Sequence, residues 1–305
     1  MKAPVRPSAA PALCLLGLVG WAGLALGCPR ESPVAHLEVA PPSLKVGFPQ
    51  SRPLHVSWEP EAALDPAAGA PTVFVHLRDR RGNLVRTFDH PFPHSFEEGS
   101  PASYDVRIFQ SALAPPLPAG SYQLTLGLYG NKTGKRWALD VSGPNLGRNE
   151  YRVAEVEVPG PASEPGPRFS FVGPWLSSES GGSRQILAVR WLNGAGTLKL
   201  EGLPGPGTVW LAVKIPAGER ATERLVVDDA SNTPSVILSS NCGGVETGIS
   251  GAGSHDVEIP TDASLTGGGC EIHLKPNFHL LKVGRPPRSV AIENAAWSRS
   301  PAPGA

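Results

Sequence analysis

The sequence predicts an all-β protein that consists of two β-sandwich domains after a signal peptide. Short segments in which apolar and polar side chains alternate recur along most of its 305 residues, as in strands with one buried face. The 35 glycines and 34 prolines separate these segments with turn residues. A proline-rich stretch, residues 159–167, divides the pattern and is expected to be a linker. The domains are therefore expected at residues 36–158 and 168–299, with a tail at 300–305.

The first 27 residues have the features of a secretory signal peptide. Lys2 and Arg6 precede an apolar run that carries no charge before Arg30. A basic start followed by an apolar segment of this kind targets a chain for export and is then removed. A retained transmembrane helix is the competing interpretation, because the run is about as long as the shortest membrane-spanning helices.

The end of this run resembles the lipobox of bacterial lipoproteins. The residues are Leu24-Ala25-Leu26-Gly27-Cys28, followed by Pro29. The resemblance implies that the Cys28 thiol receives a diacylglyceryl group, that cleavage occurs before it, and that the new amine is acylated, with palmitate a typical chain. Residues 28–35 would then be a lipidated tether, and Pro29 favours the outer membrane. An ordinary cleaved signal or an uncleaved anchor remains an alternative.

The charge composition limits the classes of partner. The chain has 27 Lys and Arg against 27 Asp and Glu, so its formal net charge is zero. Nucleic acids and anionic membrane surfaces require a clustered basic face, which this balance does not favour. We therefore expect no nucleic-acid partner, and no motif in the sequence calls for a cofactor.

The first domain contains seven or eight predicted strands. The clearest alternating sets are 54–58, 73–77, 104–108 and 122–128, and further strands are expected at 84–88, 136–139 and 150–158. In the second of these segments, Val73, Val75 and Leu77 are expected to face the core, and Phe74, His76 and Arg78 the other side. This number and spacing of strands predicts a β-sandwich.

Two longer motifs in this domain resemble an Ig-like β-sandwich. VFVHLRDRRGNLVRTFDHPFP (residues 73–93) and LPAGSYQLTLGLYGNKTGKRW (residues 117–137) are similar to Ig-like modules of bacterial envelope proteins and to those appended to some membrane glycosyltransferases. The resemblance covers residues 37–158. It implies that Tyr122 forms a tyrosine corner, with its hydroxyl bonded to nearby backbone. It also implies an accessory module without catalytic residues.

The second domain is predicted to be a jelly-roll-like sandwich. Short strands are expected at 187–191, 196–200, 209–215, 225–227, 235–238, 257–259, 272–274 and 290–292. Their number and length resemble carbohydrate-binding modules and accessory proteins of the envelope.

The four cysteines are expected to have different fates. Cys14 leaves with the signal peptide and Cys28 is the lipidation site, so Cys242 and Cys270 remain as a pair in an oxidising compartment. We expect a disulfide between them. The alternative is a metal site that uses Cys270, His273 and His279, but no second close pair of ligands accompanies them.

No catalytic or metal-binding residues are predicted. Ser254, His255 and Asp256 include the residue types of a catalytic triad, but neighbours on a strand point to opposite faces. The loop from Asp89 to Glu98 contains two histidines and three carboxylates, and it is expected to be a solvated loop between strands. We expect no metal at either place.

Trp210 is the main candidate for ligand binding. Val209, Leu211, Val213 and Ile215 would fill the buried face of its strand, so the indole must point to the opposite face, on the same side as Lys214. An aromatic ring beside a cation can stack on a sugar or on a partner protein. The alternative is that a loop or the other domain covers the indole. Trp175, near the edge of the domain, could join such a site.

These observations together predict a lipid-anchored protein of the bacterial cell envelope that is not an enzyme. It would act by binding a glycan or another envelope protein. The first alternative is a carbohydrate-active or other hydrolase whose site is assembled from loops, which a pocket with two or more convergent carboxylates would indicate. The second is a structural spacer.

Overall fold

The computed structural model describes residues 31–160, 166–218, 223–228, 230, 232–261 and 269–299. Regular structure in these residues is almost entirely β-strand, and the only helical segment among them is a short 3-10 turn, η1 (Pro66–Ala68). The prediction of an all-β sandwich protein is therefore confirmed. Cys28 and the whole signal segment lie outside the described residues. From Ser32 onward the described residues belong to one compact unit.

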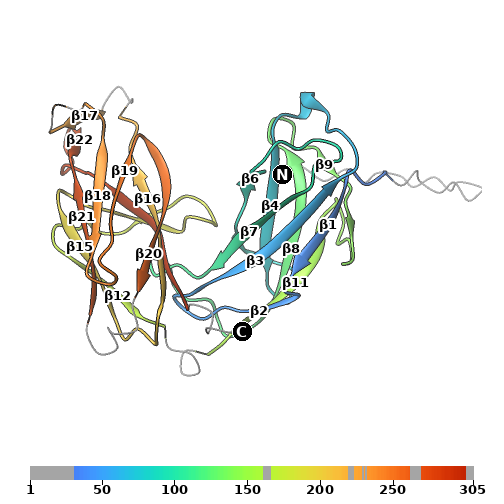
Figure 1. The fold of residues 1–305 in the computed structure, drawn as a ribbon, viewed down its shortest axis with the longest axis horizontal. Helices are drawn as coiled ribbons and strands as arrows, with labels where there is room; N and C mark the ends of the chain where they lie inside the picture. Colours follow the sequence, from blue (N-terminus) through green and yellow to red (C-terminus); the bar gives the residue numbers. More distant parts are fainter. Residues whose placement is uncertain are drawn as a thin grey trace, which may run out of the picture. The chain divides into compact units, whose positions relative to one another are not determined.

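Two sheets form the first sandwich (Figure 1). One has the strand order β10-β1-β3-β7, and the other has the order β2-β11-β8-β4-β5, with β6 paired to β4 and β9 paired to β8. The strands are β1 (Ala35–Ala40), β2 (Ser43–Lys45), β3 (Ser51–Pro60), β4 (Pro71–Arg78), β5 (Leu84–Thr87), β6 (His90–Pro91), β7 (Ala102–Phe109), β8 (Gly120–Gly130), β9 (Arg136–Trp137), β10 (Asp140–Val141) and β11 (Tyr151–Val158).

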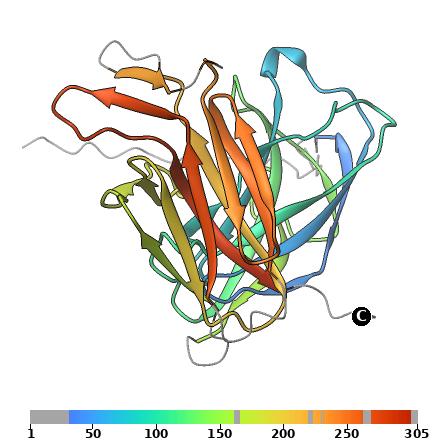
Figure 2. The same cartoon turned by 60° about the vertical axis from the view of Figure 1, so that its left-hand side comes forward.

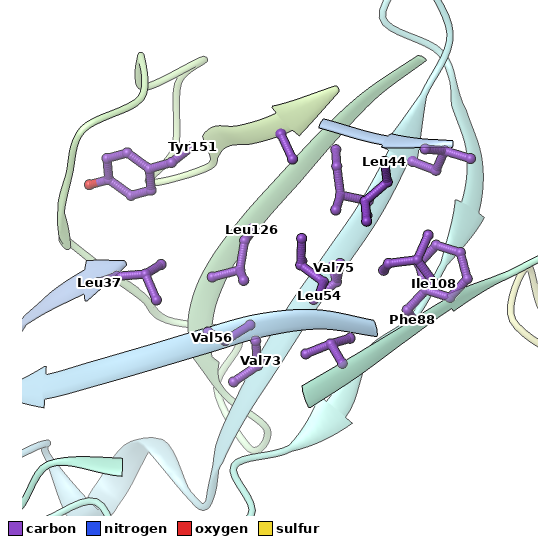
Figure 3. Packing of buried hydrophobic residues seen from close by; sticks show 14 of the residues in the cluster. Leu37, Leu44, Leu54, Val56, Val73, Val75, Phe88, Ile108, Leu126 and Tyr151 are labelled. Atoms are coloured by element: carbon purple, nitrogen blue, oxygen red, sulfur yellow. The ribbon is translucent and has the colours of Figure 1, made fainter. Parts of the chain in front are cut away.

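The predicted alternation fills the core between these sheets (Figure 3). Leu54, Val56 and Trp58 from β3 face Val73 and Val75 from β4, and all five are fully buried. The Tyr122 hydroxyl donates a hydrogen bond of 2.7 Å to the Pro118 carbonyl, four residues earlier, as expected for a tyrosine corner. The side chains that the alternating pattern predicted to face the core therefore do form it.

The outer face of β4 differs from the prediction. Phe74 and His76 were expected to face away from the core, and they do, but they are nevertheless buried. The side chains of Arg136 and Glu150 cover them: the Arg136 guanidinium lies 4.2 Å from the Phe74 ring centre, and Glu150 lies 3.6 Å from His76. A second, polar layer therefore covers this face of the sheet.

The second sandwich also has two main sheets. Their strand orders are β12-β15-β21-β18-β19 and β13-β14-β23-β16-β20, and β17 and β22 form a separate two-stranded ribbon (Figure 2). The strands are β12 (Arg168–Val172), β13 (Glu179–Ser180), β14 (Ala188–Trp191), β15 (Gly196–Glu201), β16 (Gly207–Ile215), β17 (Glu223–Val227), β18 (Ser235–Ser240), β19 (Glu246–Ser250), β20 (Gly253–Thr261), β21 (Cys270–Pro276), β22 (Phe278–Lys282) and β23 (Ala291–Arg299).

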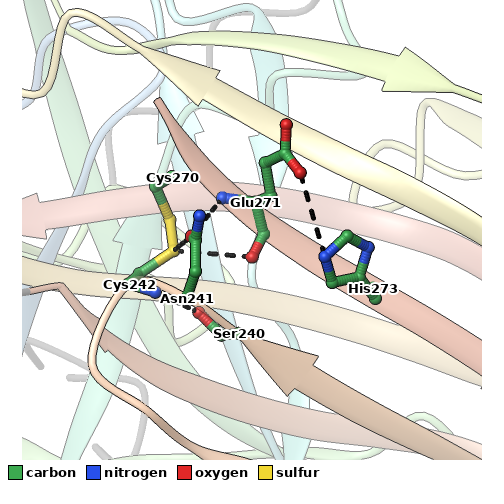
Figure 4. The surroundings of a disulfide bond; sticks show 6 residues. All are labelled: Ser240, Asn241, Cys242, Cys270, Glu271 and His273. Atoms are coloured by element: carbon green, nitrogen blue, oxygen red, sulfur yellow. Dashed lines mark hydrogen bonds and ion pairs between the residues drawn. A yellow bond between two sulfur atoms is a disulfide. The ribbon is translucent and has the colours of Figure 1, made fainter. Parts of the chain in front are cut away.

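A disulfide joins Cys242 to Cys270 at the start of β21, the central strand of the first of these sheets (Figure 4). Both residues are fully buried, and their Cα atoms are 5.1 Å apart. The Asn241 side chain accepts a hydrogen bond of 2.8 Å from the Glu271 backbone N–H, which fixes the turn beside the disulfide. The predicted disulfide is present, and its sulfur atoms are not available to a metal ion.

The two sandwiches are in direct contact. The Ala112 N–H donates to the Ala295 carbonyl at 2.7 Å, and the Trp297 N–H donates to the Pro49 carbonyl at 3.0 Å. These bonds connect β23 to segments that adjoin β3 and β7. A semi-rigid linker between separate bodies was expected at residues 159–167, of which 161–165 are not described. In the described residues, backbone hydrogen bonds join the sandwiches directly.

Candidate functional site

Trp210 points away from the core of the second sandwich, as its alternating strand predicted. Val209, Leu211, Val213 and Ile215 are fully buried in that core, whereas Trp210 belongs to the apolar cluster of the first sandwich. Its ring centre is 4.7 Å from that of Phe109 and 5.1 Å from the Arg107 guanidinium. Only 5% of the residue is exposed. The expectation of an indole platform open to a ligand is thus corrected, because the chain itself covers the ring, which was the alternative interpretation.

The other two predicted ligand-binding residues have partners within the second sandwich. The Lys214 ammonium group forms an ion pair of 2.9 Å with Glu293. The Trp175 indole donates a hydrogen bond of 3.2 Å to the Thr197 carbonyl, and its ring centre is 5.0 Å from that of Phe171. These contacts hold Trp175 against the core of the second sandwich, so the structure does not bring Trp175, Trp210 and Lys214 into one site.

A cleft of about 640 Å³ lies beside Trp210. Residues of β6 and β7 line one side, and residues of β16, β20 and β23 line the other. Its walls combine aromatic and polar groups: Tyr104, Arg107, Trp210, Asp256, Glu293 and Asn294. A concave surface with aromatic walls and a few polar groups is what a small polar ligand requires. We take this cleft as the candidate functional site.

A β-bulge in β23 places two polar residues in the cleft. Ala212 pairs with Asn294, but Val213 pairs with Ile292, so Glu293 has no partner in the ladder. Ile292 and Ala295 face the core of the second sandwich, whereas Glu293 and Asn294 both line the cleft. Bulges redirect side chains in this way and are frequent beside active sites. Sequence alternation could not reveal this, because the bulge breaks the period of two.

Glu293 is held in place by its neighbours. It is only 2% exposed, and its two oxygens accept hydrogen bonds from Lys214 at 2.9 Å and from the Ser254 hydroxyl at 2.6 Å. A buried carboxylate needs such partners to remain charged. Lys214 therefore contributes to the site by pairing with this residue.

Asp256 differs from the other carboxylates of the cleft. Burial raises its pKa, and the nearby Arg107 guanidinium only partly offsets this effect. Arg107 forms its ion pair with Glu258, and Asp256 has no ion pair with any residue that the structure describes. The Trp210 indole also favours the charged form of Asp256, although its N–H makes no hydrogen bond of normal geometry there. Asp256 can therefore accept hydrogen bonds from a ligand.

The residues considered for catalysis or metal binding have structural partners. The Ser254 hydroxyl donates to Glu293, whereas His255 Nε2 bonds the Gly251 carbonyl, so no relay connects them. Asp89 accepts a hydrogen bond of 3.0 Å from the Val75 N–H, and His90 bonds the Phe88 carbonyl. Over the described parts of the chain, no group of three His, Cys, Asp or Glu residues is placed to hold a metal ion.

One constellation was missed in the sequence. His55 Nδ1 is 2.9 Å from Asp105, and His55 Nε2 is 3.3 Å from the Ser57 hydroxyl, in the order of a catalytic relay. The spacing of His55 and Ser57 is a signal, but Asp105 joins them only through the register of β3 and β7. Because β1 and β7 pair with both edges of β3 here, its backbone N–H groups are used in the ladders and leave no oxyanion hole. We therefore do not take this relay as an active site.

The comparisons with known proteins identify no family. No protein-family model matches the chain, and no curated protein matches it. Among solved structures, the native conformation of Escherichia coli alpha-2-macroglobulin is 11% identical, with a TM-score of 0.25, over 87% of this chain and 14% of that chain. A Bacteroides uniformis β-glucuronidase is 11% identical, with a TM-score of 0.22, over 86% and 30%. The chain thus spans less than a third of either protein, and these likenesses carry no argument about function.

The described part of the chain contains no helix that is long and apolar enough to cross a membrane.

Proposed function

We propose that this protein is a non-enzymatic, glycan-binding module that a lipid anchor holds at the bacterial outer membrane. The observation that carries the binding function is the cleft beside Trp210. Tyr104, which is partly exposed, can pack on a sugar ring, and the carboxylate and carboxamide groups of the cleft suit its hydroxyls. The cleft is concave, and a volume of about 640 Å³ is in the range of small-molecule sites.

The strand order of the first sandwich supports an accessory role. β1, β3 and β7 form one sheet, and β11, β8, β4 and β5 form the other, which corresponds to the sheet arrangement of Ig-like domains. The sequence resemblance to Ig-like envelope modules points to the same class. Such modules supply binding surfaces or spacing.

Support for the anchor comes from the lipobox-like sequence at Cys28. Two or three acyl chains, at about 0.8 kcal/mol for each buried CH₂ group, hold a protein stably on a membrane. We expect Cys28→Ala to prevent acylation and to leave the precursor uncleaved or the protein released. Radiolabelled palmitate and membrane fractionation measure this. A Cys28→Ala protein that is still cleaved before residue 28 and still sediments with membranes would refute the anchor.

Glycan binding is tested with the acylated full-length protein in detergent. An array of neutral, acidic and amine-bearing oligosaccharides, followed by calorimetric titration of any ligand found, should identify a sugar that binds in the cleft. Blocking the cleft with Ala212→Leu should abolish that binding. If no glycan binds and envelope proteins co-purify instead, the ligand is a protein. If neither binds, the spacer alternative gains support.

One observation favours the hydrolase alternative: three carboxylates, Asp105, Asp256 and Glu293, line the cleft. Glycoside hydrolysis generally needs two free carboxyl groups, an acid and a base or nucleophile. Asp105 is paired with His55, and Glu293 is bonded to Lys214 and Ser254. Only Asp256 remains, so we favour binding. Release of reducing sugar from a bound oligosaccharide, abolished in Asp256→Asn, would establish the hydrolase instead.

A further inference from the structure

We propose that Asp256 and Asn294 hold a single neutral pyranose ring above Ala212, each through one of its hydroxyl groups. This inference rests on the proposed glycan-binding function and names the subsite and the class of sugar. The inference rests on the placement of two polar residues, Asp256 and Asn294, on either side of the small residue Ala212 in the cleft.

Strand register sets the positions of these three residues. Ala212 on β16 pairs with Asp256 on β20 and with Asn294 on β23. Because neighbouring strands lie about 4.8 Å apart, Asp256 and Asn294 are about 10 Å apart at their Cα atoms. The methyl group of Ala212 fills little of the space between them. Because paired residues project from the same face of a sheet, Asp256 and Asn294 stand on either side of Ala212 and leave a gap suited to one sugar ring.

The carboxamide of Asn294 is the second observation that points to a ligand. Asn294 is only 4% exposed and lines the cleft, yet its side chain makes no hydrogen bond with any described residue. Its carboxamide atoms are not enclosed by protein, so they remain open to the cleft. A ligand hydroxyl can both accept from its NH₂ group and donate to its oxygen. Asn294 is therefore placed to gain hydrogen bonds when a ligand binds.

Asp256 provides the complementary acceptor. Asp105, Glu258 and Glu293 have ion-pair partners in His55, Arg107 and Lys214, whereas Asp256 has none within the described residues. A carboxylate accepts hydrogen bonds only, so it pairs with sugar hydroxyls that donate. Hydrogen bonds to a charged group are about twice as strong as those between neutral groups.

The charges around the subsite favour a neutral ring. An anionic sugar, such as a uronic acid, would be repelled by Asp256, and the Lys214 charge is already paired with Glu293. A cationic amino sugar would be attracted by Asp256 but repelled by the Arg107 guanidinium, which lies close enough to Asp256 to act on its titration. A neutral hexose or N-acetylhexosamine meets neither repulsion.

The experiment titrates the acylated full-length protein with maltotriose, cellotriose and the N-acetylglucosamine trimer, and with galacturonate and glucosamine trimers. We expect at least one of the three neutral trimers to bind more tightly than either charged trimer. Asp256→Asn and Asn294→Asp, which preserve size, should each weaken that binding at least tenfold, and circular dichroism should show that both variants remain folded at the temperature of the titration. Glu246→Gln, at an exposed position of β19 in the other sheet, is the matched control and should bind like the wild type.

The outcomes separate this inference from the proposed function. If a neutral trimer binds and both isosteric variants bind it equally well, the subsite is wrong and the glycan-binding function stands. If only a charged trimer binds, the class of sugar is wrong. If the wild type binds neither these trimers nor any glycan on the array, the proposed function itself falls.

Discussion

At the scale of single residues, Glu150 shows how a buried charge is retained in the first sandwich. Its carboxylate accepts hydrogen bonds from Arg78 at 2.6 and 3.0 Å and from Thr125 at 2.6 Å, and Arg136 lies at 3.4 Å. Burial alone would raise its pKa, but the nearby His76 ring and the hydrogen bonds from Arg78 and Thr125 outweigh that effect and hold the pKa well below its usual range. The carboxylate is thus charged at all ordinary pH values.

We expect Glu150→Gln to lower the free energy of unfolding by about 3–5 kcal/mol, because two guanidinium groups lose their buried counter-charge. Urea unfolding, followed by tryptophan fluorescence, measures the change. Glu157→Gln is the control, since Glu157 is exposed on β11, the strand that begins directly after Glu150. Equal small effects of the two substitutions would show that the network contributes little to stability.

His76 makes stability depend on pH. It lies 3.6 Å from both Asp89 and Glu150, and although burial opposes its protonation, its interactions with these two carboxylates raise the pKa above 6.5. A raised folded-state pKa gives stabilisation that is complete below the unfolded pKa, near 6.5, and is lost as the pH rises through the folded value. We therefore expect the Tm of the wild type to fall between pH 6 and pH 9 by more than that of His76→Gln.

The measurement is the difference between the curves of Tm against pH for the wild type and for His76→Gln. His36 also has a raised pKa, through its hydrogen bond with Asp140, and contributes to both curves equally. Parallel curves for the wild type and His76→Gln would exclude His76 as the source.

At the scale of elements, the alternation of apolar and polar residues predicted which face of a strand each side chain lies on. It did not predict which of the outward-facing side chains other segments would cover. It placed Val209 and Trp210 on opposite faces of β16, as observed. It could not show that Phe74 and His76 would be buried, because that depends on residues more than fifty positions later. Gly127, whose missing side chain would collide with Phe74, lets that ring lie across β8. Such a fit is visible only when the register is known.

The candidate site was also only partly predictable, because its composition depends on strand register and on contacts between segments that are far apart in the sequence. The sequence drew attention to Trp210 and Lys214, and both adjoin the cleft through their contacts. Asn294 and Glu293 were not found, because a bulge breaks the alternation of β23. The side of the cleft formed by Tyr104 and Arg107 comes from the other sandwich, and the sequence does not encode that pairing in any local pattern.

The disulfide allows a prediction about its sheet. Cys242 and Cys270 are 28 residues apart, and closing a loop of this length stabilises a folded chain by roughly 3.5 kcal/mol in the chain-entropy model. We expect reduction, or replacement of both cysteines by Ala, to lower the free energy of unfolding by about this amount. Urea unfolding with and without a reductant measures it. Two alkylated thiols at these positions in the unreduced, freshly exported protein would contradict the pairing.

At the scale of the whole molecule, the junction of the sandwiches depends on Trp210. The ring packs on Phe109, under the Arg107 guanidinium, and Arg107 forms an ion pair with Glu258. This combination of an aromatic contact and a charge pair adds to the backbone hydrogen bonds between the two sandwiches. A stiff spacer is not needed to keep them together.

We expect Trp210→Ala to lower the free energy of unfolding by about 3–5 kcal/mol, because it removes a large buried ring from this junction. Calorimetry should also resolve two unfolding transitions where the wild type shows one, since the sandwiches lose their coupling. Trp210→Phe keeps an aromatic ring and should have a smaller effect. A Trp210→Ala protein with the wild-type Tm would show that the ring does not couple the sandwiches.

The position of β23 in its sheet determines when the second sandwich can be completed. β23 is the last described strand to be synthesised, yet it lies between β14 and β16 in the middle of the sheet. Until residues 291–299 have been made, β16 lacks a neighbour and Gln50 and Ser111 of the first sandwich lack their β23 contacts. The first sandwich can fold before residues 291–299 are in place, but the second cannot be completed without them. Chains truncated before residue 291 should therefore expose an unpaired edge and depend on chaperones.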